Sequence, residues 1–188
     1  MVAPDLHATL KHLAARKNCP LEFVAIYEDF FTGIGSVRTL EHIFSVNGLP
    51  FQLRSRSAWE FRFLASKKRL NEAVRMAAGA DLVVISKHPG SPVPEMVRRW
   101  FEEWAGLRNQ EGVLLSLADE ESPSEDLKYF EARARRAGFA FFNHKVESRR
   151  SLQGNTASLD ADSEWTAFKT VSQTVASPGI HCWGINEY

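Results

Sequence analysis

The sequence contains little cysteine, no excess of charge of one sign and no long apolar run. Its two cysteines, Cys19 and Cys182, match no metal-ligand or redox spacing, which argues against a disulfide-built fold and predicts a reducing, cytoplasmic setting. Lysine plus arginine and aspartate plus glutamate both total 23, so no net charge attracts nucleic acid or anionic lipid. No run of about 18 apolar residues is present, and the start lacks the apolar region of a signal peptide. We therefore expect a soluble cytoplasmic protein with no nucleic-acid or membrane partner.

The length and composition suit one globular domain. A chain of 188 residues, 44% of them hydrophobic, can form a full core. Within this single domain, 1–188, we expect a helical extension over 1–20, a core over 21–143, a polar insertion or linker over 144–162, and a helix and tail over 163–188.

Short apolar runs predict the strands. Segments that are apolar at consecutive positions are typical of strands buried on both faces, and they occupy 23–27, 82–85, 113–118 and 139–142. In 51–55, Phe51 and Leu53 alternate with polar residues, which predicts a weaker strand at an edge of the sheet.

Segments of helical period separate these strands. Val37, Leu40 and Phe44 share one face, and Asn47-Gly48 is a typical helix end. Ser57-Ala58-Trp59-Glu60 has the pattern of a capping box and predicts the start of a long helix, with an interruption near Ser66.

Further helices are expected in the second half of the chain. An apolar stripe from Val93 to Trp104 follows Ser91-Pro92. Ser122-Pro123-Ser124-Glu125 predicts a helix start, and Gly138 predicts the end of that helix. A last helix is predicted over 163–175.

The alternation of strands and helices predicts an α/β fold. It implies right-handed crossovers and a five-stranded parallel sheet of order 2-1-3-4-5 in a three-layer α/β/α arrangement. In that order a ligand crevice opens beyond the carboxyl ends of the first and third strands, where the winding direction reverses.

The stretch Thr32-Gly33-Ile34-Gly35-Ser36 is the first candidate for a site in this crevice. A turn with hydroxyls and unhindered amides just before a helix is typical of an anion site, which predicts a phosphate-containing ligand. The alternative is a flexible turn with an ordinary serine cap.

Two stretches resemble the flavodoxin-like proteins and the related NADPH-dependent FMN reductases. IYEDFFTGIGSVRTLE, residues 26–41, resembles their phosphate loop, and residues 79–104 are similar to their third strand, ring-contacting loop and following helix. The resemblance implies FMN as cofactor and electron or hydride transfer as any activity. It also implies these cofactor-binding residues: Thr32, Gly33, Gly35, Ser36, Ser86, His88, Gly90 and Asp119.

A second reading is a degenerate receiver domain. Glu28 and Asp29 resemble the acidic pair of receivers, and Ser116 and Lys145 resemble their hydroxyl and lysine positions. The phosphoacceptor position holds Ser86 or Lys87, which cannot form an aspartyl phosphate. This reading predicts a ligand-free interaction or regulatory module, and it leaves a protein partner or a homo-oligomer open.

The remaining motifs leave the chemistry open. His88 suits a general base, a flavin-edge contact or a solvent-facing loop residue. No zinc spacing or Walker loop is present, so no metal site is predicted, and the sequence leaves open whether the protein is an enzyme.

Overall fold

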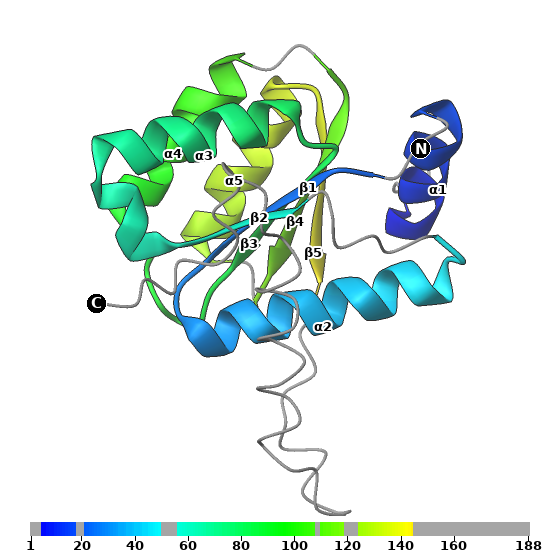
Figure 1. The fold of residues 1–188 in the computed structure, drawn as a ribbon, viewed down its shortest axis with the longest axis horizontal. Helices are drawn as coiled ribbons and strands as arrows, with labels where there is room; N and C mark the ends of the chain where they lie inside the picture. Colours follow the sequence, from blue (N-terminus) through cyan, green and yellow to red (C-terminus); the bar gives the residue numbers. More distant parts are fainter. Residues whose placement is uncertain (1–4, 18–20, 50–55, 108–109, 119–123, 145–188) are drawn as a thin grey trace, which may run out of the picture.

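The chain alternates strands and helices along most of its described length (Figure 1). The computed structural model describes residues 5–17, 21–49, 56–107, 110–118 and 124–144. The elements are α1 (Leu6–Lys17), β1 (Phe23–Tyr27), α2 (Phe30–Val46), β2 (Arg56–Glu60), the 3-10 helix η2 (Phe61–Ala65), α3 (Lys67–Gly79), β3 (Leu82–Ser86), α4 (Glu95–Leu107), β4 (Gly112–Leu117), α5 (Glu125–Arg136) and β5 (Phe139–His144).

The sheet has the predicted strand order. Its five strands are arranged β2-β1-β3-β4-β5, and every neighbouring pair is parallel. Every residue of β1, β3 and β4 is buried, as expected for apolar runs that are covered on both faces. The predicted α/β fold with flavodoxin-like strand order is therefore confirmed.

The edge strand β2 differs from the prediction. The predicted strand 51–55 lies outside the described residues, and the strand that pairs with β1 is Arg56–Glu60. The prediction that Ser57-Ala58-Trp59-Glu60 caps a helix is wrong, because Ala25 and Ile26 of β1 pair with Ala58 and Trp59. Pairing with β1 and burial of Trp59 outweigh the local capping pattern. Helix α3 begins only at Lys67, next to the predicted interruption at Ser66.

The predicted helix ends are confirmed, and some predicted starts are shifted. Asn47 is the C-cap of α2, and Gly48 and Gly138 follow α2 and α5 with φ of 64° and 80°. The N-cap of α5 is Ser124, whose side chain accepts a hydrogen bond from the Leu127 N–H at 3.3 Å. That helix therefore starts after Ser124 rather than at the predicted Ser122.

Two hydrophobic clusters lie on opposite faces of the sheet, whose covering helices are shown in Figure 1. Helices α3, α4 and α5 cover one face, and α1 and α2 cover the other. Leu6, Leu10 and Leu13 of α1 are part of the second cluster, so the amino-terminal helix contributes to the core.

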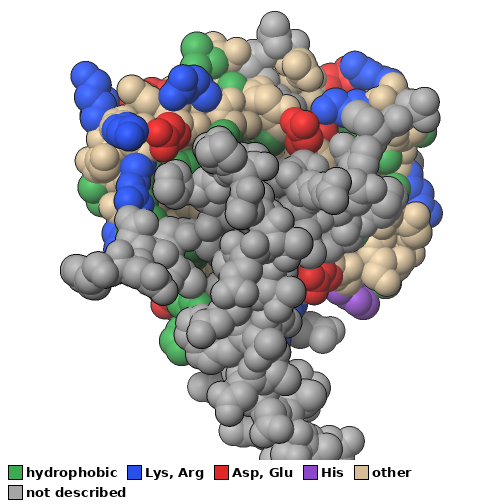
Figure 2. Space-filling view, in the orientation of Figure 1, with side chains coloured by type: hydrophobic (Ala, Val, Ile, Leu, Met, Phe, Trp, Pro, Cys, Tyr) green, Lys and Arg blue, Asp and Glu red, His purple; other side chains and the backbone are tan. Residues whose placement is uncertain are grey.

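The described surface carries charges of both signs. Figure 2 shows basic and acidic side chains interspersed around the described part of one face, as the zero net charge predicts. Among the described helices, none is long and apolar enough to cross a membrane. The predicted helix 163–175 lies outside the described residues.

Candidate functional site

The candidate site is the carboxyl edge of the sheet between β1 and β3. Tyr27 and Ser86 are the last paired residues of these strands, and the Glu28 N–H donates to the Ser86 carbonyl at 3.0 Å. The strand order reverses its winding direction here, which is where doubly wound folds bind ligands.

Asp29 caps α2 at this edge. The Thr32 N–H donates to Asp29 Oδ1 at 3.0 Å, and the Asp29 N–H donates to Thr32 Oγ1 at 2.9 Å. This reciprocal pair is a capping box in which the acid is the N-cap residue. A carboxylate of the chain therefore lies at the amino end of α2, where a bound phosphate would be stabilised by the helix dipole.

Thr32, Gly33, Gly35 and Ser36 lie inside α2. The prediction that they form a turn before the helix is wrong, because α2 begins at Phe30. The Gly33 N–H donates to the Asp29 carbonyl at 2.9 Å, and the buried Ser36 hydroxyl donates to the Thr32 carbonyl at 2.8 Å. Asp29 accepts the hydrogen bond of the Thr32 N–H, and Gly33 and Ser36 donate within the helix, so a phosphate at this helix end would lie beside the Asp29 carboxylate.

Gly33 has a packing role. A Cβ at this position would lie 3.0 Å from Cδ2 of Tyr27, so a side chain at residue 33 would press against the Tyr27 ring. Tyr27 is buried, and burial together with the nearby Glu60 carboxylate raises the pKa of Tyr27 to about 12. The phenol is therefore neutral near pH 7.

His88 links the loop after β3 to the end of β1. Its Nε2 lies 2.7 Å from Asp29 Oδ2, and its backbone N–H donates to Glu28 Oε2 at 2.7 Å. Burial disfavours the Asp29 carboxylate, but hydrogen bonds from Thr32 and His88 outweigh burial, so the pKa of Asp29 lies below its ordinary value. His88 and Asp29 remain 45% and 40% exposed at their side chains. This arrangement orients the imidazole and leaves it accessible to solvent.

The rest of the loop is held by its own hydrogen bonds. The buried Lys87 donates from Nζ to the Ser91 carbonyl at 2.8 Å and to the His88 carbonyl at 3.4 Å. Gly90 has a φ of 74°, which suits the tight turn between them. Ser86, buried at the end of β3, donates from its hydroxyl to the Thr32 carbonyl at 3.1 Å. The predicted residues Ser86, His88 and Gly90 thus lie at the carboxyl end of β3.

The structure brings together only some of the residues that resemble the functional positions of a receiver domain. Glu28 and Asp29 both contact His88, and Ser116 is buried within β4. Asp119 and Lys145 lie outside the described residues. Where the structure describes the chain, no group of three or more His, Cys, Asp or Glu side chains could hold a metal ion.

Phe30 and Phe31 form an exposed aromatic pair that the sequence reasoning missed. They are 43% and 71% exposed, and their rings meet edge to face with centroids 5.9 Å apart. As the first residues of α2 they adjoin Asp29 at the carboxyl edge. The signal in the sequence was two adjacent phenylalanines that precede the apolar stripe of Leu40 and Phe44.

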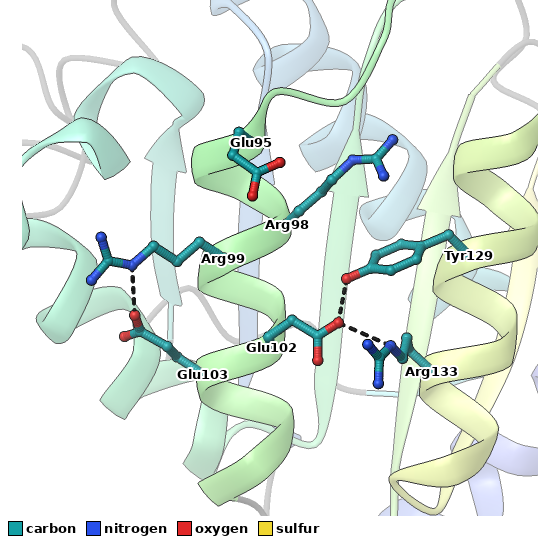
Figure 3. Close-up of a pocket in the computed structure, with 7 residues that line it drawn as sticks. All are labelled: Glu95, Arg98, Arg99, Glu102, Glu103, Tyr129 and Arg133. Atoms are coloured by element: carbon teal, nitrogen blue, oxygen red, sulfur yellow. Dashed lines mark hydrogen bonds and ion pairs between the residues drawn. The ribbon is translucent and has the colours of Figure 1, made fainter.

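A groove of about 480 Å³ lies elsewhere, between α4 and α5 (Figure 3). Glu102 accepts hydrogen bonds from the Tyr129 hydroxyl and from Arg133 Nε, the latter at 2.9 Å. Partial burial and the hydrogen bond to Glu102 raise the pKa of Tyr129 to about 12. Arg98 pairs with Asp126 at 2.5 Å and Arg99 with Glu103 at 2.8 Å, so these arginines are neutralised within the chain.

The fold and site define a doubly wound α/β protein of flavodoxin-like strand order. Neither a family model nor a curated protein matches the chain. Among solved structures, it is similar to the flavodoxin-like domain of a Synechococcus sp. protein, with 14% identity, 68% of this chain and 83% of that chain covered, and a TM-score of 0.43.

Two further solved structures are similar at the same level. The Flv1 flavodiiron core from Synechocystis sp. PCC6803 is 15% identical, with 73% of this chain and 33% of that chain covered and a TM-score of 0.43. A flavodoxin from Streptococcus pneumonia TIGR4 is 11% identical, with 67% and 82% covered and a TM-score of 0.42. The fold of the present chain is defined by its own strand order and not by these likenesses.

Proposed function

We propose that this protein is an interaction module that binds a partner protein at the carboxyl edge of its sheet, with Phe31 at the centre of the contact. The observation that supports this proposal most directly is the exposure of two adjacent aromatic side chains. Phe30 is 43% exposed and Phe31 is 71% exposed. Aromatic side chains, Phe among them, are enriched at protein interfaces, and exposed apolar patches mark interaction sites.

The hydrogen bonds around Asp29 support this proposal. The carboxylate at the amino end of α2 is part of the chain, and His88 and Glu28 join the neighbouring loop to β1. An edge whose polar groups bond one another is suited to pack against another surface rather than to enclose an anion.

A comparison of exposed apolar residues tests the proposal. The full chain serves as bait for chemical crosslinking and capture in three forms: wild type, Phe31→Ser and Leu107→Ser. Leu107 is 64% exposed at the end of α4, so it matches Phe31 in exposure but lies in another element. We expect a partner that is captured by wild type and by Leu107→Ser and lost with Phe31→Ser. Capture that is equal in all three forms would contradict the proposal.

FMN binding for electron transfer is the second candidate, supported by the same aromatic pair. The loops after β3 and β4 contain no Tyr or Trp to stack on a flavin ring, and Phe30 and Phe31 offer such a face. In this reading Thr32, Gly33, Gly35 and Ser36 contact the phosphate, while Ser86, His88, Gly90 and Asp119 border the ring. The Asp29 carboxylate opposes the phosphate part of that site.

Titration with FMN and with riboflavin separates the two candidates. Under the interaction proposal, neither flavin shows saturable fluorescence quenching at tens of micromolar, and the isolated protein has no flavin absorbance between about 300 and 500 nm. Saturable binding of FMN but not riboflavin would establish phosphate recognition and make electron transfer the leading function. Binding of both would indicate ring recognition alone.

A further inference from the structure

Several basic side chains lie beyond the carboxyl end of β2, in η2 and at the start of α3 (Figure 1). This group, called the η2–α3 basic cluster, consists of Arg62, Lys67, Lys68 and Arg69. Glu60, the last residue of β2, pairs with Tyr27, the last residue of β1, so the cluster lies at the same edge of the sheet as the start of α2. It is a separate surface from Phe31, because η2 and α3 cover the opposite face of the sheet.

Most of the positive charge in this cluster is not neutralised by the described part of the chain. Arg62 pairs with Glu60 at 2.8 Å. Lys67 and Lys68 are exposed and have no ion-pair partner among the described residues. By contrast, the arginines of the groove between α4 and α5 pair with acidic side chains. The cluster therefore presents a local excess of positive charge on a protein whose net charge is zero.

These charges do not stabilise α3. Lys67, Lys68 and Arg69 form the first turn of this helix, where the helix dipole favours acidic side chains, and the first turn contains no acid. Neighbouring like charges also repel one another. A local arrangement that costs stability is typical of residues retained for a function.

An aromatic ring orients two of the cations. The guanidinium carbons of Arg62 and Arg69 lie 5.1 and 4.4 Å from the centroid of the Phe63 ring. Stacking on a ring limits the orientations of a guanidinium, and its planar N–H groups match the two oxygens of a carboxylate. Arg62 is exposed and Arg69 and Phe63 are half-buried, so these stacked groups are accessible to a partner.

The extent of the cluster limits the kind of partner. Its four cations lie within residues 62–69, and Glu28 and Asp29 follow the neighbouring strand β1 at the same edge. A nucleic-acid strand or an anionic bilayer presents an extended array of phosphates, which these two carboxylates would repel. A short acidic segment of a protein can pair with the cluster and leave Glu28 and Asp29 uncovered.

We propose that the η2–α3 basic cluster binds an acidic segment of a partner protein. Lys67, Lys68 and the stacked guanidiniums pair with its carboxylates. This contact is independent of the one proposed for Phe31. Because the charged groups lie at the surface, the attraction weakens as the salt concentration rises.

Binding of a labelled octaglutamate peptide to the full chain tests the proposal by fluorescence anisotropy. The double variant Lys67→Glu, Lys68→Glu is compared with Lys11→Glu, Lys128→Glu, which makes the same change of net charge at exposed positions of α1 and α5. We expect the first double variant to weaken binding by about tenfold or more and the second by about twofold or less. Equal weakening by the two double variants, or the absence of saturable binding to the wild type at low salt, would overturn the proposal.

Two single variants test which groups take part. Arg69→Lys keeps the charge but removes the planar guanidinium, so we expect binding to weaken by about threefold. An unchanged affinity would contradict the role of the stacked guanidinium. Phe31→Ser should bind the peptide as the wild type does, which separates this contact from the one proposed for Phe31. Weaker binding by Phe31→Ser would contradict that separation.

Thermal unfolding of the same variants distinguishes a lost contact from a lost fold. The unfolding midpoint of Lys67→Glu, Lys68→Glu should be unchanged or raised, because acidic side chains then occupy the first turn of α3. A lowered midpoint would show that the two lysines stabilise the helix, and the proposal would be wrong.

Two further probes test the alternative partners. An oligothymidylate with as many charges as the peptide represents nucleic acid, and vesicles that contain phosphatidylserine represent an anionic membrane. We expect both to bind more weakly than the peptide. Tighter binding of either probe that is lost in Lys67→Glu, Lys68→Glu would assign the cluster to that partner and rule out the acidic segment.

Discussion

The two faces of the sheet are packed by different kinds of side chain. The face under α3, α4 and α5 is rich in aromatic residues, and Trp104 meets Phe101 and Phe139 edge to face at 5.1 and 4.9 Å. The face under α1 and α2 is mainly aliphatic. It is joined to the amino edge of the sheet by Lys17 and Asp81, whose charged groups lie 2.8 Å apart.

This difference determines which substitutions should destabilise each face. On the aromatic face, the indole N–H groups of Trp59, Trp100 and Trp104 are buried with no hydrogen-bond partner in the described residues. Large apolar area therefore stabilises this face in spite of unsatisfied donors. The aliphatic face depends in addition on a buried carboxylate, because Asp81 is 3% exposed and also accepts the Glu22 N–H at 2.9 Å.

The largest effect is expected on the aromatic face. Trp104→Ala removes a side chain that is fully buried and should lower the free energy of unfolding by about 3–5 kcal/mol. Trp104→Phe should cost about 1–2 kcal/mol, because the loss of volume is partly offset by removal of an unsatisfied N–H. Urea unfolding followed by circular dichroism measures both changes. A loss for Trp104→Phe well above about 2 kcal/mol would mean that the indole N–H has a hydrogen-bond partner in the folded protein.

The second-largest effect is expected when the ion pair between Lys17 and the buried Asp81 on the aliphatic face is removed. Asp81→Ala leaves the Lys17 ammonium and the Glu22 N–H without this acceptor, and should cost about 2–3 kcal/mol. The matched control is Glu111→Ala, which removes the partner of Arg16 from the same end of α1. Both members of that pair are more than 60% exposed, so a change of at most about 0.5 kcal/mol is expected. Similar losses in the two variants would show that burial of the ion pair does not matter here.

The third effect concerns the start of α2 at the carboxyl edge. Asp29→Ala removes the cap and should cost about 1–2 kcal/mol at neutral pH. The pKa of Asp29 is lowered in the folded protein, so its contribution is complete above the ordinary value of 3.8 and is lost as pH falls through the lower folded value. Urea unfolding as a function of pH should therefore show the wild type and Asp29→Ala converging below pH 3.8. A gap that persists unchanged to pH 2 would assign the effect to a cause other than ionisation.

Much of the fold could be predicted because the deciding signals are local. The consecutive apolar residues of β1, β3 and β4 and the glycines at Gly48 and Gly138 each reflect a requirement that the neighbouring residues set. The strand β2 could not be placed, because Ser57 and Glu60 satisfy a local capping pattern while pairing with β1 is a long-range contact. The structure decides in favour of the pairing.

The candidate site could be located but not described from the sequence. The strand order places Glu28, Asp29 and His88 at one edge, as predicted. The cap of α2 was missed because the glycines and hydroxyls after Phe31 resemble a loop, whereas Asp29 starts the helix before them. FMN binding, recognition of a phosphate-containing ligand and the cytoplasmic location stay predictions.

The smallest effect contrasts two helix glycines on opposite faces of the sheet. Gly79→Ala in α3 adds a methyl group with nothing within 4 Å, so it should be neutral or stabilise by up to about 1 kcal/mol through helix propensity. Gly33→Ala in α2 gains the same propensity, but its Cβ would lie 3.0 Å from the buried Tyr27 ring. Because the Tyr27 ring is only 6% exposed, we expect the steric cost to exceed the gain and Gly33→Ala to lose about 0.5–2 kcal/mol. Thermal unfolding of the two variants measures the difference. If Gly33→Ala is as stable as Gly79→Ala, the Tyr27 ring can move aside, and close packing of α2 on β1 is not the reason for glycine at this position.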